Sequence, residues 1–203
     1  ARRLILFRYR SFFDALGSAN LLLAQSPSAI ETIDENILTL ARADASYHSL
    51  RHLIDGPDER PRDLDVEPDA VKAINLVEFE GRDVAEVERF VERCISEVAP
   101  HYGEDGAPTG HLIAESDRDQ ALMWGLRKRG VGLLAARPGR RKPIAFVEDT
   151  AVEVDRLPEY VKRLQKVVED HDTWAGFYGH ASVGCLHFRP LINCKDPTDI
   201  AKL

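Results

Sequence analysis

The sequence has few cysteines, and none of them is spaced like a metal ligand. It contains three, at Cys94, Cys185 and Cys194, and no CxxC pair. An odd and sparse set argues against a disulfide framework and indicates free thiols in a reducing compartment. We therefore expect each cysteine to be a small, buried, apolar side chain.

Long apolar runs and an excess of positive charge are also missing. No run approaches the roughly 18 apolar residues of a membrane-spanning helix. The apolar run that begins at Leu4 is too short for a signal peptide, and Arg8 interrupts it. A net charge of −7 argues against non-specific attraction to nucleic acid or to anionic membranes. These absences favour a cytoplasmic protein without a transmembrane segment.

The sequence also lacks the motifs that hold nucleotide phosphates. A doubly wound nucleotide-binding fold carries a glycine-rich fingerprint after its first strand. No such fingerprint follows the first apolar run, Leu4 to Tyr9, and the Walker pattern does not occur either. The sequence therefore predicts no phosphate-binding loop in this chain.

What the chain does contain is an alternation of short apolar strands with amphipathic helices. With 203 residues, of which 44% are hydrophobic and 30% charged, it can form a domain with a substantial core. The expected strands are Leu4 to Tyr9, Ile74 to Glu80, His111 to Ala114, Pro143 to Val147, Ala175 to Tyr178 and Cys185 to Ile192. The pattern predicts an α+β fold, with a largely antiparallel sheet and amphipathic helices stacked on one face.

Two expected helical regions carry residues of interest. Residues 11–54 read as helical with a break near Pro27, so Glu31 and Asp34 are expected on one wet helix face. A helix capped by Ser116 is expected to stop at Gly130, with Arg127 in its last turn. An Arg at a helix end can clamp a carboxylate in a bidentate pair, although it can equally be a solvated helix terminus.

Residues 55–69 form a distinct segment. The stretch DGPDERPRDLDVEPD holds three prolines and many charges, which predicts a mobile surface loop within the domain.

Both chain ends are expected to be truncations, so that residues 1–203 form a fragment of one domain. The chain opens inside a strand-like run and closes soon after a helix start at Asp196 and Pro197.

The segment YGHASVGCLH contains the strongest candidate site. On a straight strand His180 and His187 would lie about 23 Å apart, at about 3.3 Å per residue. They can share a metal only if the chain turns back between them, which Gly184 and its neighbours allow. Imidazole is a good ligand for zinc or manganese. The alternative is two separate histidines, one in the core and one exposed, and no nearby carboxylate is an obvious third ligand.

A pair of acids follows an expected strand. Glu148 and Asp149 could act as a base or as a ligand, or Glu148 could be solvated with Asp149 starting a turn.

The order WGLRKRG, KPIAFVEDTAV, a helix and then GFYGHASVGCLHFRP resembles the C-terminal cap domain of FAD-linked oxidases, the group that includes glycolate oxidase, D-lactate dehydrogenase and D-2-hydroxyglutarate dehydrogenase. LVEFEG occurs in its expected place as well, so the resemblance covers nearly the whole chain. It is nearest to the branch whose full-length members carry an iron-sulfur segment, and it implies a ferredoxin-like cap domain.

The resemblance implies an oxidoreductase that transfers hydride from a small D-2-hydroxyacid to FAD, with electrons passing on to an acceptor such as an iron-sulfur cluster. It implies that His180 and His187 bind a divalent metal such as zinc or manganese, and that Arg127 grips the substrate carboxylate. A third ligand and the catalytic histidine are implied in an EHG motif beyond Leu203, so no catalytic residue is expected in this chain.

FAD would be bound mainly by another domain of the same polypeptide. We therefore expect the chain alone to hold no FAD tightly and to be inactive. The resemblance also allows the complete enzyme to attach peripherally at the inner membrane face.

The sequence departs from the family motif GHxGDGNLH within the histidine segment. Ser182 and Val183 stand where the motif has Gly-Asp, and Cys185 stands where it has Asn. The histidine spacing is kept, whereas the surroundings of the metal and the choice of substrate are open to change. The alternative function is a stand-alone α+β module that binds a small molecule or a metal without redox activity.

Overall fold

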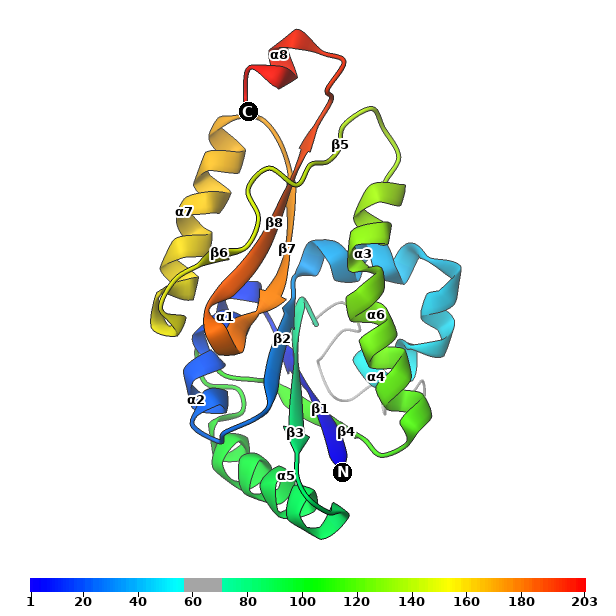
Figure 1. Cartoon of the computed structure of the whole chain (residues 1–203), viewed down its shortest axis with the longest axis vertical. Coiled ribbons are helices and arrows are strands. Elements are labelled where there is room, and N and C mark those ends of the chain that lie inside the picture. Colours follow the sequence, from blue (N-terminus) through cyan, green and yellow to red (C-terminus); the bar gives the residue numbers. More distant parts are fainter. Residues whose placement is uncertain (57–70) are drawn as a thin grey trace.

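The computed structural model describes residues 1–56 and 71–203, and an antiparallel sheet organises them (Figure 1). The strands are β1 (Arg2–Tyr9), β2 (Ala29–Ile33), β3 (Ala73–Glu80), β4 (Gly110–Ala114), β5 (Lys142–Pro143), β6 (Thr150–Ala151), β7 (Ala175–His180) and β8 (Cys185–Ile192). Their order is β4-β1-β3-β2-β7-β8-β5, with β6 also paired to β8. Every pairing is antiparallel, which confirms the predicted α+β class.

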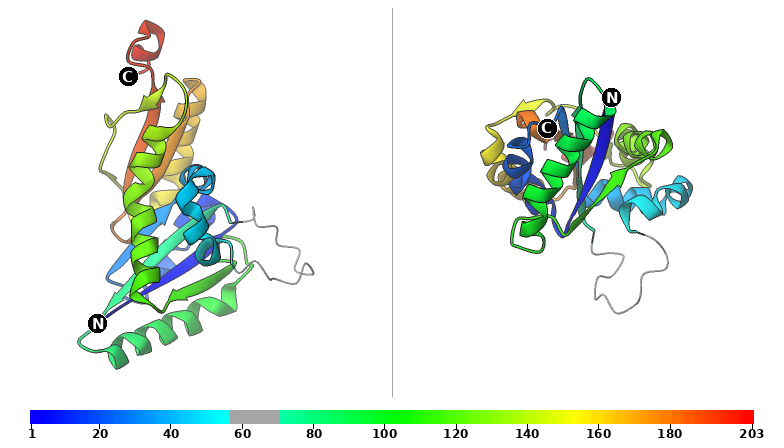
Figure 2. Two further views of the ribbon diagram at one scale, coloured as in Figure 1. Left: turned by 90° about the vertical axis from the view of Figure 1, so that its right-hand side faces the viewer. Right: turned by 90° about the horizontal axis from the view of Figure 1, so that it is seen from below.

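Helices cover both faces of this sheet. The α-helices are α1 (Phe12–Gly17), α2 (Ala19–Leu23), α3 (Glu35–Ala43), α4 (Arg51–Ile54), α5 (Val84–Val98), α6 (Asp117–Ala136), α7 (Leu157–Asp170) and α8 (Pro197–Ile200). Short 3-10 turns lie at Ala45–Ser49, Ala99–His101, Val154–Arg156 and Ala181–Val183. Helices α1, α2, α5 and α7 lie on one side of the sheet, and α3, α4 and α6 lie on the other (Figures 1 and 2).

The expectation that the helices stack on one face is therefore corrected, and β1 shows the physical reason. Its odd residues, such as Ile5 and Phe7, are fully buried on the side of α1 and α5, while Leu4 and Leu6 are fully buried on the α6 side. A strand that is apolar on both faces must be covered on both faces. Each such side chain contributes about 1.5–3 kcal/mol by leaving water.

Strand β2 is the element that the sequence pattern hides. Ala29–Ile33 was expected to be helical, but it pairs with β3 and β7 in the middle of the sheet. Ile30 and Ile33 have helical spacing with Ile37, which favoured a helix, yet they pack into different cores. Glu31 consequently lies on a strand, and Asp34 is the N-cap of α3, where its side chain accepts a hydrogen bond from the Ile37 amide.

Two further boundaries differ from the prediction. Helix α6 runs through Gly130 to Ala136, so Arg127 lies inside the helix instead of in its last turn. Gly130 is buried inside α6 next to Ile37, so the helix does not end at this glycine. The strand expected over residues 143–147 is reduced to Lys142–Pro143, with Thr150–Ala151 pairing separately.

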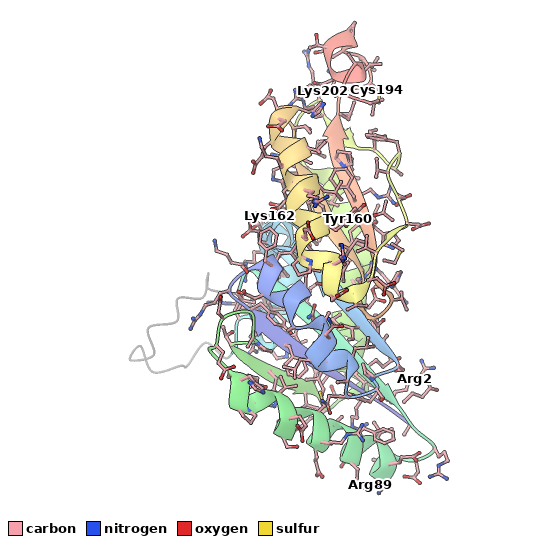
Figure 3. All side chains as sticks on the ribbon, turned by 90° about the vertical axis from the view of Figure 1, so that its left-hand side faces the viewer. Arg2, Arg89, Tyr160, Lys162, Cys194 and Lys202 are labelled. Atoms are coloured by element: carbon pink, nitrogen blue, oxygen red, sulfur yellow. The ribbon has the colours of Figure 1, made fainter. Side chains whose placement is uncertain are left out.

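Other predicted elements are confirmed. The expected strands in β1, β3, β4, β7 and β8 are present, and the helix capped by Asp83 runs from Val84 to Val98. Cys94 is buried in that helix, whereas Cys185 is half-buried and Cys194 is exposed, so the expectation of buried cysteines holds for Cys94 alone. Cys194 lies near Lys202 at one end of the molecule, far from Arg2 and Arg89 (Figure 3).

The loop expected over 55–69 falls almost entirely outside the described residues. Its first residue, Asp55, accepts hydrogen bonds from Arg42 at 2.8 Å and from the Tyr47 hydroxyl at 2.6 Å. Arg42 also donates to the carbonyl of Val71 at 2.8 Å. One arginine on α3 thus holds the chain at both sides of that segment.

The β7–β8 hairpin reverses within four residues, and two glycines make this reversal work. Gly184 has a φ of +67°, and a Cβ there would lie 1.8 Å from the Val152 carbonyl oxygen. At Gly179 a Cβ would lie 2.4 Å from the Cys185 carbonyl oxygen. Only glycine fits these positions without moving the backbone. The reversal pairs His180 with Cys185 and Tyr178 with His187.

Candidate functional site

Strand alternation brings a group of polar side chains together on the α6 side of the sheet. His180 lies opposite Glu31 in the β2–β7 pairing, and His187 lies opposite Tyr178 in the β7–β8 pairing. Side chains of cross-strand partners stand on the same face, close enough to interact. The neighbouring strands β2, β7 and β8 therefore present Glu31, Tyr178, His180 and His187 as one surface beneath α6.

The two histidines of the sequence motif face each other. Their Nε2 atoms lie 3.4 Å apart, and the rings meet edge to face with centroids 5.2 Å apart. The chain turns back between them, so the 3-10 turn Ala181–Val183 and Gly184 replace the long separation of a straight strand. The structure thus brings together the two residues that the sequence proposed as metal ligands.

Glu31 lies directly behind this pair. Its Oε1 is 2.5 Å from Nδ1 of His180, and its Oε2 accepts a hydrogen bond from Nε of Arg127 at 2.7 Å. The Glu31 side chain is 9% exposed and that of Arg127 is 12% exposed. Both oxygens of a nearly buried carboxylate are therefore committed, one to His180 and one to Arg127.

Arg127 reaches the sheet from the middle of α6. Its guanidinium carbon lies 4.7 Å from the centroid of the Tyr178 ring, and that ring lies 4.9 Å from the ring of His187. A guanidinium over an aromatic face is held in a defined plane by cation–π attraction. All three residues named from the sequence, Arg127, His180 and His187, thus converge on one place.

The second nitrogen of His187 is short of a partner. Nδ1 is buried and lies 3.0 Å from Oδ1 of Asp149, but it makes no hydrogen bond of acceptable geometry within residues 1–56 and 71–203. Burial, followed by the positive charge of Arg127 and the neighbouring His180, lowers the pKa of His187 below its ordinary value. His187 is therefore biased toward the neutral form that coordinates metals.

The expected acid pair contributes at the rim. Glu148 forms an ion pair with Arg189, and Arg189 donates to the Tyr178 hydroxyl at 3.3 Å. Asp149 is 77% exposed beside His187 and has a positive φ of 54°. Glu148 is thus paired instead of solvated. Asp149 lies at a bend with positive φ, close to the turn that one of the two alternatives expected.

Cys185 lies on the same face, at the position where the family motif has Asn. Burial, with added repulsion from Asp149 and Glu31, raises the pKa of its thiol above the ordinary value. A thiol with a raised pKa is a weak ligand, because the thiolate is the form that binds metal. Cys185 therefore adds a neutral side chain to the site.

The donor set suits part of a metal site. Two imidazole nitrogens at about 2.0–2.1 Å from a tetrahedral zinc ion would be about 3.3 Å apart, close to the observed 3.4 Å. With Nδ1 protons directed at the carboxylates of Glu31 and Asp149, both Nε2 lone pairs would face each other, an arrangement that a cation stabilises. In the part of the chain that the structure describes, no group of three or more His, Cys, Asp or Glu side chains is arranged so that it could hold a metal ion. This part would supply two ligands.

Glu31 is the residue that sequence reasoning missed as a site member. It was placed on a solvated helix face with Asp34 because the surrounding isoleucines repeat at helical spacing. The segment Ala29–Ile33 carries no clear alternation that could have shown this, because Glu31 and Ile33 fall on one strand face and Ile30 and Thr32 on the other, one polar and one apolar residue on each.

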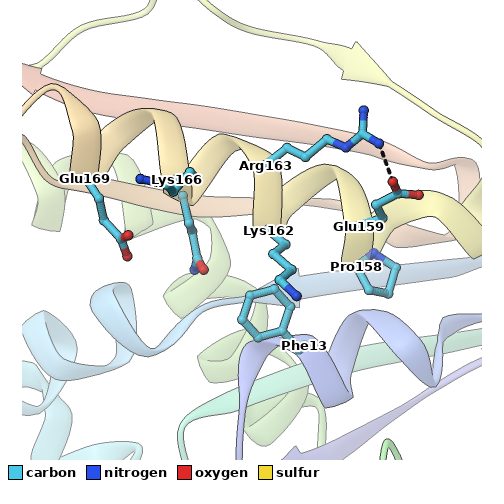
Figure 4. Close-up of a pocket in the computed structure, with 8 residues that line it drawn as sticks. Phe13, Pro158, Glu159, Lys162, Arg163, Lys166 and Glu169 are labelled. Carbon is cyan, nitrogen blue, oxygen red and sulfur yellow. Dashed lines mark hydrogen bonds and ion pairs between the residues drawn. The ribbon is translucent and has the colours of Figure 1, made fainter.

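A separate large cavity lies elsewhere on the molecule. It has a volume of about 1040 Å³ and runs along α7 and α1, on the opposite face of the sheet (Figure 4). Phe13 and Pro158 line it together with charged side chains of α7, such as Lys162 and Glu169, and Arg163 pairs with Glu159 within it. Its charged residues are those of an exposed helix, and none joins the histidine pair.

Solved structures share this architecture. p-Cresol methylhydroxylase with substrate bound superposes with a TM-score of 0.61, at 9% identity, over 100% of this chain and 41% of the other. 4-Ethylphenol oxidase from Gulosibacter chungangensis, in its isoeugenol complex, gives a TM-score of 0.59 at 10% identity, over 100% of this chain and 41% of that one. At such identities the likeness shows the fold alone.

Sequence relatives are nearer. The D-2-hydroxyglutarate dehydrogenase of Pseudomonas putida is 36% identical over 198 residues, covering 98% of this chain and 19% of that protein. The enzyme of the same name from Escherichia coli is 32% identical over 201 residues, covering 97% of this chain and 18% of the relative. The chain thus spans about a fifth of the length of these relatives. The family described as FAD linked oxidases, C-terminal domain, matches residues 1–203, and the chain belongs to that family.

Proposed function

We propose that this chain is the substrate-side domain of an enzyme that oxidises the C2 hydroxyl of a D-2-hydroxyacid of the D-lactate, glycolate or D-2-hydroxyglutarate type. Family membership makes it the C-terminal substrate domain of an FAD-linked oxidoreductase. The observation that carries the finer proposal is the meeting of Arg127 and the His180–His187 pair at one buried carboxylate. A 2-hydroxyacid presents a carboxylate and a hydroxyl on adjacent carbons, which such a pair of subsites can bind together.

Arg127 is the proposed carboxylate anchor. Its guanidinium is fixed by Glu31 on one side and by the Tyr178 ring beneath it. A pre-oriented guanidinium can donate two parallel hydrogen bonds to a carboxylate, and each bond to a charged group contributes about 1.5–3 kcal/mol.

His180 and His187 are the proposed ligands of a divalent metal such as zinc or manganese. When bound there, such a metal acts as a Lewis acid toward a substrate oxygen and lowers the pKa of a hydroxyl that it contacts. The two histidines hold their Nε2 atoms at the spacing of neighbouring ligands, and the lowered pKa of His187 keeps its imidazole neutral. The third ligand and the base would come from outside this chain.

The flavin of the family would likewise be held mainly by another domain of the polypeptide, because no phosphate-binding loop occurs in this sequence. When bound, FAD supplies the hydride acceptor. Passage of the electrons to an iron-sulfur centre or another acceptor is a prediction of the family resemblance, and none of the residues described bears on it.

The alternative of a stand-alone binding module would require these residues to act without a flavin domain. Membership of an FAD-linked family argues for the oxidoreductase. Among the described residues no helix is long and apolar enough to cross a membrane.

The test uses the complete polypeptide to which this chain belongs. Under anaerobic conditions, its flavin should be bleached by D-lactate, glycolate or D-2-hydroxyglutarate and not by the L-enantiomers of the chiral acids. Reduction by para-alkylphenols, with none by any 2-hydroxyacid, would contradict the proposal. Removal of divalent metal with a chelator should slow bleaching at least tenfold, and zinc or manganese should restore it.

A further inference from the structure

Glu31 forms hydrogen bonds to both proposed subsites, the histidine pair and Arg127. Its two carboxylate oxygens lie 2.5 Å from His180 Nδ1 and 2.7 Å from Arg127 Nε. We propose that Glu31 is a positioning residue that fixes the tautomer of His180 and the orientation of Arg127 at the same time. The consequence for substrate rests on the function proposed above, whereas the tautomer does not.

The effect on His180 follows from the chemistry of the two groups. A carboxylate paired with a guanidinium accepts hydrogen bonds and donates none. His180 Nδ1 must therefore carry a proton toward Glu31, which leaves a lone pair on Nε2 when the ring is neutral. That lone pair points at His187, 3.4 Å away. Carboxylates in this arrangement orient metal-binding histidines and raise their basicity.

The effect on Arg127 concerns which of its N–H groups a ligand can use. Nε is occupied by Glu31, and within the described chain no hydrogen bond of the terminal nitrogens is seen. The Tyr178 ring lies under the guanidinium at 4.7 Å. A ligand carboxylate would therefore accept hydrogen bonds from the two terminal nitrogens, in the plane that Glu31 and Tyr178 define.

A simple structural ion pair would not explain the arrangement. Such a pair satisfies Arg127 alone, and a buried pair by itself adds little stability. Here the second oxygen is directed at an imidazole whose other nitrogen faces another imidazole. The remaining charged groups beside the histidines are Arg189 on β8 and Glu148 and Asp149 in the segment before β6, and among the described residues none of the three forms a hydrogen bond or ion pair with His180.

The decisive variant is Glu31→Gln, which keeps size and shape. Arg127 Nε can only donate, so it should take the amide oxygen and leave the amide NH₂ toward His180. An NH₂ group donates, so His180 Nδ1 should become an acceptor and its proton should move to Nε2. Glu148→Gln is the matched control, because Glu148 pairs with Arg189 and not with His180.

Long-range ¹H–¹⁵N NMR of the 203-residue chain at about pH 8, above the ordinary imidazole pKa near 6.5, reports the tautomer directly. We expect the Nδ1–H form of His180 in the wild type and in Glu148→Gln, and the Nε2–H form in Glu31→Gln. An Nε2–H tautomer in the wild type would overturn the inference even if Glu31→Gln failed to fold. An unchanged tautomer in a folded Glu31→Gln variant would overturn it as well.

Zinc titration of the same samples separates this inference from the proposed function. If zinc binds the wild type, Glu31→Gln should weaken it at least about tenfold, while Glu148→Gln should not. A tautomer that depends on Glu31 supports the positioning role whether or not zinc binds. No zinc effect in the complete flavoenzyme would count against the metal of the proposed function alone.

Discussion

The two faces of strands β2, β7 and β8 differ as much as any two regions of this molecule. One face carries Ile30, Phe177, Leu186 and Phe188, all nearly or fully buried under α1 and α7. The other carries Glu31, Tyr178, His180 and His187, linked by hydrogen bonds, ion pairs and ring contacts beneath α6. Alternate residues of the same strands thus build a dry core and a polar site.

The contrast shows how a rigid site can be made from strands. Side chains on the core face fix the strand positions, and the pleat then fixes the direction of every second side chain on the other face. A site on paired strands of this kind is held more firmly than one on loops. Substitutions on the core face should therefore lower the free energy of unfolding. Substitutions on the site face should alter function, and they should also lower stability where they leave a buried charge without its partner.

The largest effect on stability is expected from the core face. Phe177→Ala should lower the free energy of unfolding by about 3–5 kcal/mol, because it leaves a cavity next to Phe12 and Phe188. Urea unfolding measures this change. Tyr178→Phe, one residue away on the site face, should cost only about 0.5–1.5 kcal/mol for one lost hydrogen bond. Equal costs at the two positions would break the comparison.

A smaller loss is expected when a charge on the site face loses its partner. Arg127→Met should destabilise the chain by about 3 kcal/mol, because it leaves the Glu31 carboxylate buried beside His180 alone. Adding Glu31→Gln should recover part of that loss, since the stranded charge is then removed. Urea unfolding of the single and double variants checks this, and additive losses would count against a buried pair.

His111, on β4 and on the core side of the sheet, makes the free energy of unfolding depend on pH in a defined direction. Burial, followed by Arg8, lowers the pKa of His111, whose Nδ1 meets the Tyr102 hydroxyl at 2.7 Å. The unfolded state then binds a proton more readily, so the stability is full above about pH 6.5 and is lost as pH falls through the folded pKa.

The slope from this group is at most about 1.4 kcal/mol per pH unit. His111→Phe should reduce it, as measured by the urea midpoint between about pH 5 and pH 8. A wild-type stability that rises relative to His111→Phe on acidification would have the wrong sign.

The smallest effect is expected in the groove along α7. Glu159→Ala removes an ion pair with Arg163 whose side chains are 54% and 78% exposed. An exposed i,i+4 helix pair contributes about 0.3–0.5 kcal/mol. The thermal midpoint should fall by no more than a few degrees, and activity of the complete enzyme should not change. A marked loss of activity would show that this groove has a role that the geometry does not reveal.

The sequence predicted the fold class and most of the strands because their apolar runs are short and bounded by glycine, proline or capping residues. β7 and β8 could be placed from YGHASVGCLH, where Gly179 and Gly184 mark the reversal. β2 could not be placed, because a central strand buried on both faces has no clear alternation and its isoleucines also fit a helix. Isoleucines at this spacing are compatible both with a helix and with a strand that is buried on both faces.

The site was predicted only in part, because strand β2 was not recognised from the sequence. Arg127, His180 and His187 stand in motifs, so the resemblance could name them. Glu31 could be recognised only after β2 was placed, because its importance comes from lying opposite His180 across two strands that are 149 residues apart in sequence. Long-range pairing of this kind leaves no local signal in a single sequence.

The role of Arg127 as substrate anchor is tested most directly by kcat/KM of the complete flavoenzyme for its D-2-hydroxyacid, compared between Arg127→Lys and Arg129→Lys. Arg129 lies two residues along the same helix and contacts Ser46 and the Gly125 carbonyl, away from the histidines. We expect a fall of at least about tenfold for Arg127→Lys, since lysine cannot supply the paired donors, and little change for Arg129→Lys. Equal values for the two variants would contradict the assignment of this face as the substrate site.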